Sequence, residues 1–204
     1  MIYKVKTIEN KAKLHWQDIK KANIDKLLWV KNKAPKAYAQ MVYIKDYGFL
    51  VKLTCLESNP CRKCFHDNDD LRVDSSLEAY LMFDNERYMN LETNANGARK
   101  QAIRYNRENK QYIYANEFGG FKVKANIYPN YWDVNIDIPL DNLLKLYTNI
   151  DRKDIKKGFT FKGNFYKVHE LRNTPYEHYL AWQEIINPFP ECHLKEQFGT
   201  LIID

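Results

Sequence analysis

One segment of this 204-residue chain carries hydrogen-bonding side chains at every second position. If Tyr88–Asn94 forms a β-strand, then Tyr88, Asn90, Glu92 and Asn94 share one face, because side chains alternate along a strand. Carboxylates and amides on a rigid strand suit a saccharide, whose hydroxyls both donate and accept hydrogen bonds. The residues alone are equally compatible with an ordinary solvated face that carries cross-strand polar pairs.

The segment before this row is predicted to be its partner strand. Leu77–Phe83 and Arg87–Asn94 flank the turn Asp-Asn-Glu and should form a hairpin, which places Glu78 beside the polar row. Glu78 and Glu92 also resemble the carboxylate pair of a glycosidase. A flat sheet face offers no cleft, however, and the sequence lacks the common nucleophile-elbow, zinc-protease, P-loop and dinucleotide motifs. We therefore expect no catalysis, with a glycan-processing enzyme as an alternative.

A second group of reactive side chains lies in a polar loop. Cys61 and Cys64 have metal-ligand spacing, and His66 follows two residues later. A structural zinc site needs four ligands and no second pair of this kind is present, so we expect free thiols and no metal. The acidic run Asp67–Asp70 lacks the spacing of a calcium loop and is expected to be a solvated turn.

The elements that must position these groups are mainly strands. Many short segments alternate between apolar and polar residues, which indicates an antiparallel β-sandwich with short peripheral helices. We expect one domain, residues 1–204, in which residues 1–33 are a helical or irregular lead-in packed on the sandwich. Asp141 is expected to cap a helix at Asn142–Tyr147 after Pro139 ends a strand. The predicted strands are Ala37–Ile44, Phe49–Glu57, Leu77–Phe83, Arg87–Asn94, Phe121–Tyr128, Tyr131–Ile138, Asn164–Glu170, His178–Gln183 and Gly199–Ile203. Residues predicted to share one core are Leu81, Phe83, Leu91, Trp132, Val134, Ile136 and Phe165.

Five motifs occur in a defined order: DSSLEAYLMF from Asp74, YMNLETNANG from Tyr88, GNFYKVHE from Gly163, HYLAWQEI from His178 and FPECHLKEQFGTLII from Phe189. From about Pro35 to Ile203 this series resembles the family 9-like carbohydrate-binding modules. The closest likeness is to the stand-alone branch with an N-F-Y-K strand and a closing F-G-x-L strand. The resemblance implies an immunoglobulin- or jelly-roll-like sandwich that binds a saccharide or oligosaccharide without catalysis.

The resemblance also implies which residues meet the sugar. Glu78 matches the family glutamate that accepts hydrogen bonds from the ligand. The full set expected to bind is Arg72, Glu78, Tyr88, Asn90, Glu92, Asn94, Lys167, His169, Trp182 and His193. Binding members hold the terminal sugar between two tryptophans, and counting along this sequence gives Arg72 and Cys192 at those positions. Some members bind structural calcium, and no other cofactor is implied.

Charge and hydropathy limit the classes of partner that the protein is expected to bind. The net charge of +6 comes from 32 basic and 26 acidic residues that are largely interleaved. The basic stretches Lys11–Lys33 and Arg99–Lys110 are therefore interpreted as solvated surface rather than a nucleic-acid footprint. No apolar run approaches a membrane span, and no secretory signal is evident, so a cytoplasmic location is expected. A small saccharide or a sugar phosphate would suit such a location, with Arg72 and Lys167 meeting an anionic group. A protein-interaction module that has lost sugar binding is an alternative, and no oligomeric state is predicted.

Overall fold

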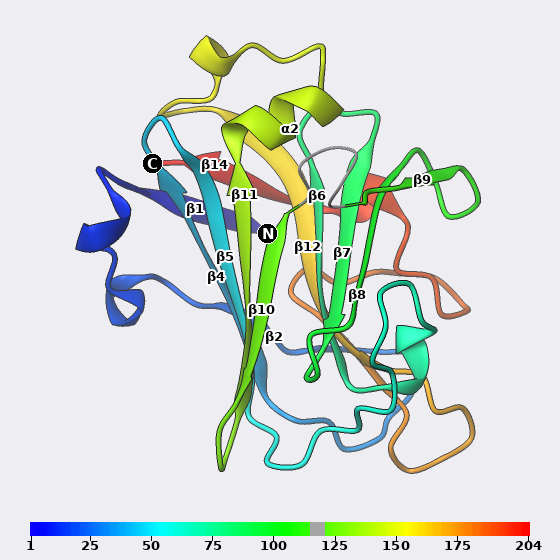
Figure 1. Ribbon diagram of the computed structural model, residues 1–204. Helices are drawn as coiled ribbons and strands as arrows, with labels where there is room; N and C mark the ends of the chain where they lie inside the picture. Colours follow the sequence, from blue (N-terminus) through cyan, green and yellow to red (C-terminus); the bar gives the residue numbers. More distant parts are fainter. Residues whose placement is uncertain (115–120) are drawn as a thin grey trace.

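The computed structural model describes residues 1–114 and 121–204, and Figure 1 shows mainly β-strands arranged in two layers. Neighbouring strands of the first layer are, in order, β10 (Lys122–Ile127), β11 (Trp132–Pro139), β5 (Gly48–Cys55) and β4 (Ala37–Ile44), with β2 (Ala22–Ile24) beside β4. The second layer contains β14 (Gly199–Ile203), β12 (Thr160–His169), β6 (Ser76–Met82), β7 (Tyr88–Asn94), β8 (Arg99–Arg104) and β9 (Lys110–Tyr112), with β13 (His178–Ala181) beside β12 and β3 (Lys26–Leu28) beside β13.

Strand β1 (Ile2–Ile8) connects the two layers. Its first half pairs in parallel with β14, and its second half pairs in parallel with β4. The sheet is therefore mixed, and the prediction of an antiparallel sandwich was correct only for the remaining strand pairs. The prediction of a helical or irregular lead-in was also wrong, because residues 1–33 supply β1, β2 and β3 as well as two short 3-10 turns. Alternation in Ile2–Ile8 buries Tyr3 and Val5 in the main core, a pattern that the sequence interpretation overlooked, whereas Ile8 packs in a separate cluster with Val42 and Ile44.

The remaining helical elements are short. They are η1 (Lys11–Lys13), η2 (Trp16–Asp18), η3 (Leu71–Val73), α2 (Leu140–Leu146), η4 (Arg152–Asp154) and η5 (Lys195–Gln197). The helix expected at Asn142–Tyr147 starts two residues earlier, and Pro139 rather than Asp141 occupies its N-cap position. Leu140, Leu143 and Leu146 are buried, so packing of this apolar stripe determines where α2 lies. Within the described ranges, no helix has the length and apolar character needed to cross a membrane.

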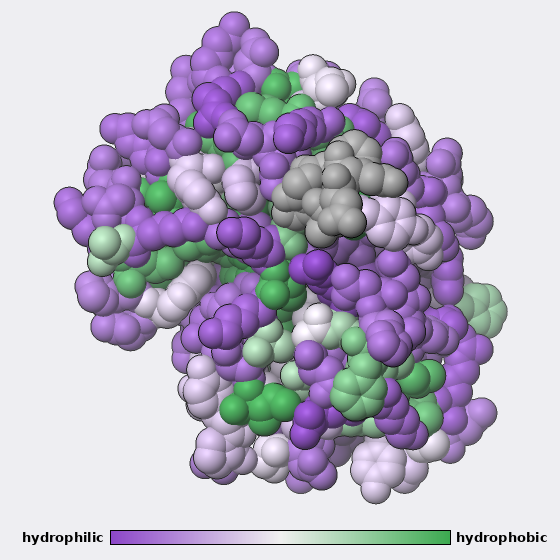
Figure 2. Space-filling model, viewed as in Figure 1, coloured by the Kyte–Doolittle hydropathy of each residue, from purple (hydrophilic) through white to green (hydrophobic). Residues whose placement is uncertain are grey.

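The main hydrophobic core fills the space between the two layers. All seven residues predicted to share a core belong to it, which confirms the alternation assigned to β6, β7, β11 and β12. Gly163 permits the close approach of β12 to β6, since a Cβ atom there would lie 2.6 Å from the carbonyl oxygen of Tyr80. The face of the molecule in Figure 2 is mostly hydrophilic, as expected for a chain with many charged residues.

A second apolar cluster covers the outer face of the second layer. It contains side chains that point away from the main core, including Tyr80, Tyr88, Tyr166, Tyr179 and Phe198. Both faces of β6 and β7 are consequently buried along their whole length. The polar row of β7 was expected to lie on an open sheet face, and this feature of the prediction was wrong, because the chain before β14 packs over it.

Candidate functional site

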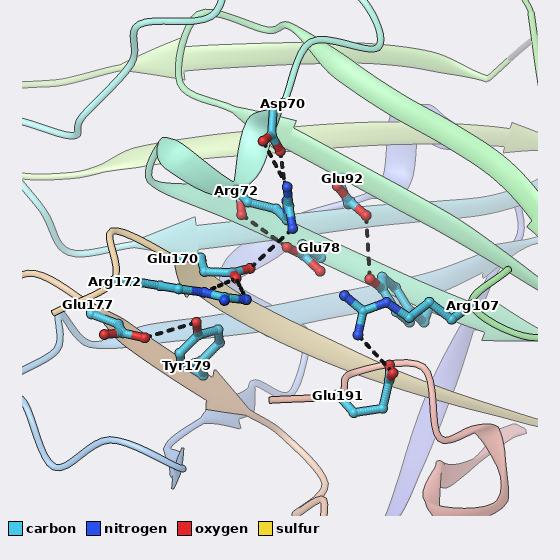
Figure 3. A network of polar contacts seen from close by, with 12 residues as sticks. Asp70, Arg72, Glu78, Glu92, Arg107, Glu170, Arg172, Glu177, Tyr179 and Glu191 are labelled. Carbon is cyan, nitrogen blue, oxygen red and sulfur yellow. Dashed lines mark hydrogen bonds and ion pairs between the residues drawn. The ribbon is translucent and has the colours of Figure 1, made fainter. Parts of the chain in front are cut away.

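The outer face of β6 and β7 forms the floor of a small cavity. The cavity has a volume of about 60 Å³ and is lined by Arg72, Glu78, Tyr80, Glu92, Arg107, Val168, Glu170, Tyr179, Pro190, Glu191, Cys192 and His193. Its walls come from η3, from the end of β12, from β13 and from the loop at residues 190–193. Figure 3 shows charged side chains from these segments converging on one region. The alternation in the strand sequences puts these polar groups on the face opposite the main core.

Two carboxyl groups face each other across the floor. Glu78 on β6 and Glu92 on β7 are direct partners in the strand register. The Ser76 hydroxyl donates to Oε1 of Glu78 at 3.0 Å, and the Asn90 amide donates to Oε1 of Glu92 at 2.9 Å. Burial raises the pKa of Glu78 to about 8, and the adjacent Glu92 contributes to the rise. The protonated carboxyl group of Glu78 can therefore donate a hydrogen bond near neutral pH.

Aromatic rings provide the apolar part of the cavity. The ring of Tyr80 stacks on His193 at a centroid separation of 5.2 Å, and the Tyr80 hydroxyl contacts Oε1 of Glu92 at 3.4 Å. The Tyr88 hydroxyl and Nδ1 of His193 share a hydrogen bond of 2.9 Å. Burial, and then the nearby positive charge of Arg104 and other basic residues, lowers the pKa of His193 to about 3. His193 is thus a neutral hydrogen-bonding ring at physiological pH.

Ion pairs define the walls of the cavity (Figure 3). Arg72 makes a two-pronged contact with Asp70, at 2.7 and 2.9 Å, and its guanidinium lies 4.0 Å from Glu170. The hydrogen bond from Arg72 lowers the pKa of Asp70. Arg107 donates to Glu191 at 2.9 Å. Because these charges are paired, the walls are held in place with few free donors, which favours a preformed site.

A wider recess adjoins the cavity. Its volume is about 370 Å³, and its lining residues are Asn68, Asp70, Arg72, Glu92, Lys100, Arg104, Arg107, Lys110 and His193. Arg72, Glu92, Arg107 and His193 line both spaces. The two spaces therefore form one composite site, with acidic groups in the inner part and mostly basic groups in the outer part.

The ten residues expected to bind a ligand occupy three different environments. Arg72, Glu78, Glu92 and His193 line the composite site. Tyr88, Asn90 and Asn94 are fully buried and do not line it. Lys167, His169 and Trp182 lie on the other face of their strands or in the main core.

The buried residues of the polar row support their neighbours. Tyr88 holds His193 through its hydroxyl. The Asn90 side chain links Glu92 to the guanidinium of Arg104, whose Nε donates to Oδ1 of Asn90 at 2.8 Å. Asn94 donates to Asp74 and to the backbone carbonyl of Cys64, at 2.8 and 2.9 Å. It therefore anchors the cysteine-containing loop.

Lys167 and His169 do not share the face of Glu78. Tyr166 is the strand partner of Glu78, and Lys167 alternates to the side where Phe165 packs in the main core. Lys167 is completely buried, where its Nζ lies 2.9 Å from Nε2 of His178, and burial lowers its pKa. Placing Phe165 in the core while placing Lys167 at the ligand was inconsistent with a period of two. Trp182 belongs to the main core for a similar reason, since Leu180 packs there too.

The loop with Cys61, Cys64 and His66 is held by internal contacts. The carboxylate of Asp74 accepts from the backbone N–H groups of Lys63 and Cys64, at 2.7 and 2.9 Å. Asp69 caps the backbone of Phe65 and His66, and Asp67 pairs with Arg99. Among the described residues, no three histidine, cysteine, aspartate or glutamate side chains are close enough together to hold a metal ion. In the acidic run, Asp70 pairs with Arg72, so Asp67, Asp69 and Asp70 all make contacts within the protein.

Several lining residues were not identified from the sequence. Tyr80 shares the face of Glu78 by simple alternation and could have been added on that basis. Glu170, Tyr179 and Glu191 come from the end of β12, from β13 and from a loop, so only the fold brings them together. The basic lining residues lie in the stretch Arg99–Lys110, which had been interpreted as solvated surface; they are Lys100, Arg104, Arg107 and Lys110.

Comparisons with known proteins find a carbohydrate-binding family and two solved structures of similar fold. The family model described as carbohydrate-binding family 9 matches residues 6–203. No curated protein matches the sequence. A solved structure of a candidate carbohydrate-binding protein from Bacteroides uniformis is similar over 100% of this chain and 99% of that chain, with a TM-score of 0.79 and 19% identity. A carbohydrate-binding module of family 9 from Caldicellulosiruptor kristjanssonii, solved in complex with glucose, is similar over 100% of this chain and 95% of that chain, with a TM-score of 0.65 and 11% identity.

Proposed function

Because this chain belongs to carbohydrate-binding family 9, we propose that it binds a saccharide at the composite site without modifying it. The relative in complex with glucose has the same fold, which makes a hexose a reasonable first ligand. The sugar edge would enter the inner cavity, and the rest of the ring would occupy the wider recess.

The main support for the proposal is that Glu78 and Glu92 are cross-strand partners on two rigid, buried strands. Oε2 of Glu92 has no hydrogen-bond partner among the described residues, although its carboxylate lines both spaces. A sugar hydroxyl can supply the missing donor and can accept from the neighbouring carboxyl at the same time. Such groups select a pattern of hydroxyls at low entropic cost, because the strands already hold them in position.

The size of the inner cavity favours binding over catalysis. A volume of about 60 Å³ accommodates only a few groups of the size of water. Glycoside hydrolysis requires carboxyl groups on both sides of a bond that joins two sugars, and an inverting enzyme needs room for a water as well. The inner cavity, where Glu78 and Glu92 both lie, has space for hydroxyl groups, and a linkage between two rings would have to lie in the wider recess, which Glu92 lines but Glu78 does not.

Calorimetry on a variant of Glu92 tests the proposal. A glycan array at physiological salt identifies the sugar, and titration then gives the affinity of the wild type and of Glu92→Gln. We expect a dissociation constant on the order of 10 µM to 1 mM for the wild type. Removal of a charge-assisted acceptor should weaken binding by about 1.5–3 kcal/mol, which is roughly 10- to 150-fold.

Glu9→Gln provides the matched control, because Glu9 is exposed and does not line the composite site. Its affinity should equal that of the wild type. Circular dichroism and thermal unfolding establish that both variants are folded. Equal affinity in a folded Glu92→Gln variant would place the sugar elsewhere, and absence of binding to every sugar on the array would reject saccharide binding altogether.

A further inference from the structure

The outer recess has the opposite charge character from the inner cavity. Because the inner cavity is too small for a monosaccharide, most of the ligand must lie in the recess of about 370 Å³, a size typical of small-molecule sites. Five cationic side chains line this recess, and the only carboxylates in its lining are Asp70 and Glu92. The lining therefore carries an excess of positive charge, which a neutral sugar would not offset.

The excess lies mainly on two lysines. Arg72 is paired with Asp70, and Arg107 is paired with Glu191. Arg104 donates to the side-chain oxygen of Asn90 and to the backbone carbonyl of Arg107. In the part of the chain that the structure describes, Lys100 and Lys110 form no ion pair. Nζ of Lys110 lies 5.7 Å from the centroid of the Tyr112 ring.

The strand register fixes where these lysines lie. Glu78, Glu92 and Lys100 are successive cross-strand partners on β6, β7 and β8, so they form one line across the sheet. Lys110 on β9 is the partner of Arg104 on β8. Along this line, the two carboxyl groups can form hydrogen bonds with sugar hydroxyls, and the ammonium group of Lys100 can pair with an anion.

We propose that the ligand is an anionic saccharide, a sugar that carries a carboxylate, phosphate or sulfate group. Its hydroxyls would meet Glu78 and Glu92, and its anionic group would lie between Lys100 and Lys110. This inference rests on the proposed function and specifies the class of sugar. Lys167, which the sequence had suggested for the anionic group, is completely buried and therefore does not take this role. The depressed pKa of His193 reflects burial first and then the same cluster of positive charge.

Three sugars that differ in charge at one carbon test the inference. The wild-type protein is titrated with glucose, glucuronate and glucose 6-phosphate at about 50 and about 300 mM NaCl. We expect the two anionic sugars to bind at least tenfold more tightly than glucose at low salt. The advantage should shrink at high salt, because added ions screen solvent-accessible charges.

The double variant Lys100→Gln/Lys110→Gln should reduce the ratio of anionic to neutral affinity to about one. The matched control is Lys153→Gln/Lys156→Gln, which removes two exposed lysines outside the composite site and should keep the wild-type ratio. Inorganic phosphate is titrated as a separate probe and should bind at least tenfold more weakly than glucose 6-phosphate.

Each remaining outcome decides against the inference. Glucose binding without any preference for the anionic sugars overturns it and leaves the proposed function intact. Phosphate that binds as tightly as glucose 6-phosphate indicates an anion site without sugar recognition, and this also overturns it. If no sugar in the titrations or on the array binds, both the proposed function and the inference are wrong.

Discussion

Replacing Glu78 with glutamine should stabilise this protein at alkaline pH and change its stability little at acidic pH. Glu78 is 4% exposed and lies directly opposite Glu92, so its ionised form is unfavourable in the folded state. Glutamine has nearly the same shape and keeps the oxygen that accepts the hydrogen bond from Ser76. The variant therefore removes the ionisation and preserves the packing.

The sign and size of the effect follow from the pKa of Glu78. Burial raises this pKa from 4.5 to about 8, so the folded protein holds the proton more tightly than the unfolded chain does. The stability from this group is fully present below the unfolded pKa, and it is lost as the pH rises through the folded pKa. Between about pH 5 and pH 8 the loss amounts to roughly 3 kcal/mol for the wild type. Glutamine does not ionise and avoids this loss.

Urea unfolding at about pH 5, 6.5 and 8 measures the effect. The free energy of unfolding of Glu78→Gln should exceed that of the wild type by an amount that grows with pH, while Glu9→Gln follows the wild type throughout. Stability differences that are the same at all three pH values would refute the reasoning, because they would show that Glu78 does not ionise over this range. A variant that is less stable at pH 8 would contradict it outright.

Three further outcomes are expected. Trp132→Ala should lower the free energy of unfolding in urea by about 3–5 kcal/mol, because Trp132 is completely buried in the main core; a change below about 1 kcal/mol would contradict this. Gly199→Ala should destabilise the protein by about 1–3 kcal/mol, since the added Cβ would lie 2.5 Å from the ring of Trp182; an unchanged midpoint of thermal unfolding would contradict the packing. Cys64 should react with a thiol reagent before the buried Cys55. Its reaction should be slow at pH 7 and faster toward pH 10, because burial raises the pKa of the Cys64 thiol to about 11. Mass spectrometry of labelled peptides gives the order of labelling, and earlier labelling of Cys55 would contradict the expectation.

The alternation of apolar and polar residues along the sequence was sufficient to predict most strands and the main core. It placed Leu81 and Leu91 on one face of their hairpin and Trp132 and Val134 inside, as the structure has them. The alternation in β1 was overlooked, and it would not have shown that β1 pairs in parallel with β14 at the other end of the chain. Pairing between segments that lie nearly 200 residues apart leaves no local pattern, because it depends on the whole topology.

The site was predictable only in part, for the same reason. Alternation and family resemblance found Glu78 and Glu92, which the strand register indeed makes partners. The cover over the polar face comes from distant segments, so the sequence could not indicate that Tyr88 and Asn90 would be buried. The charge pattern of Arg99–Lys110 resembled a solvated surface, and the short turn at Gly97 that joins β7 to β8 as a hairpin was overlooked.

A crystal structure of the protein with a bound saccharide tests the central claim most directly. The sugar is the one that the glycan array identifies, with glucose as the first choice. We expect electron density for the sugar in the composite site, with hydroxyl oxygens within about 2.5–3.2 Å of the carboxyl groups of Glu78 and Glu92. A sugar bound at another place on the surface, with the cavity between β6, β7 and residues 190–193 left empty, would contradict it.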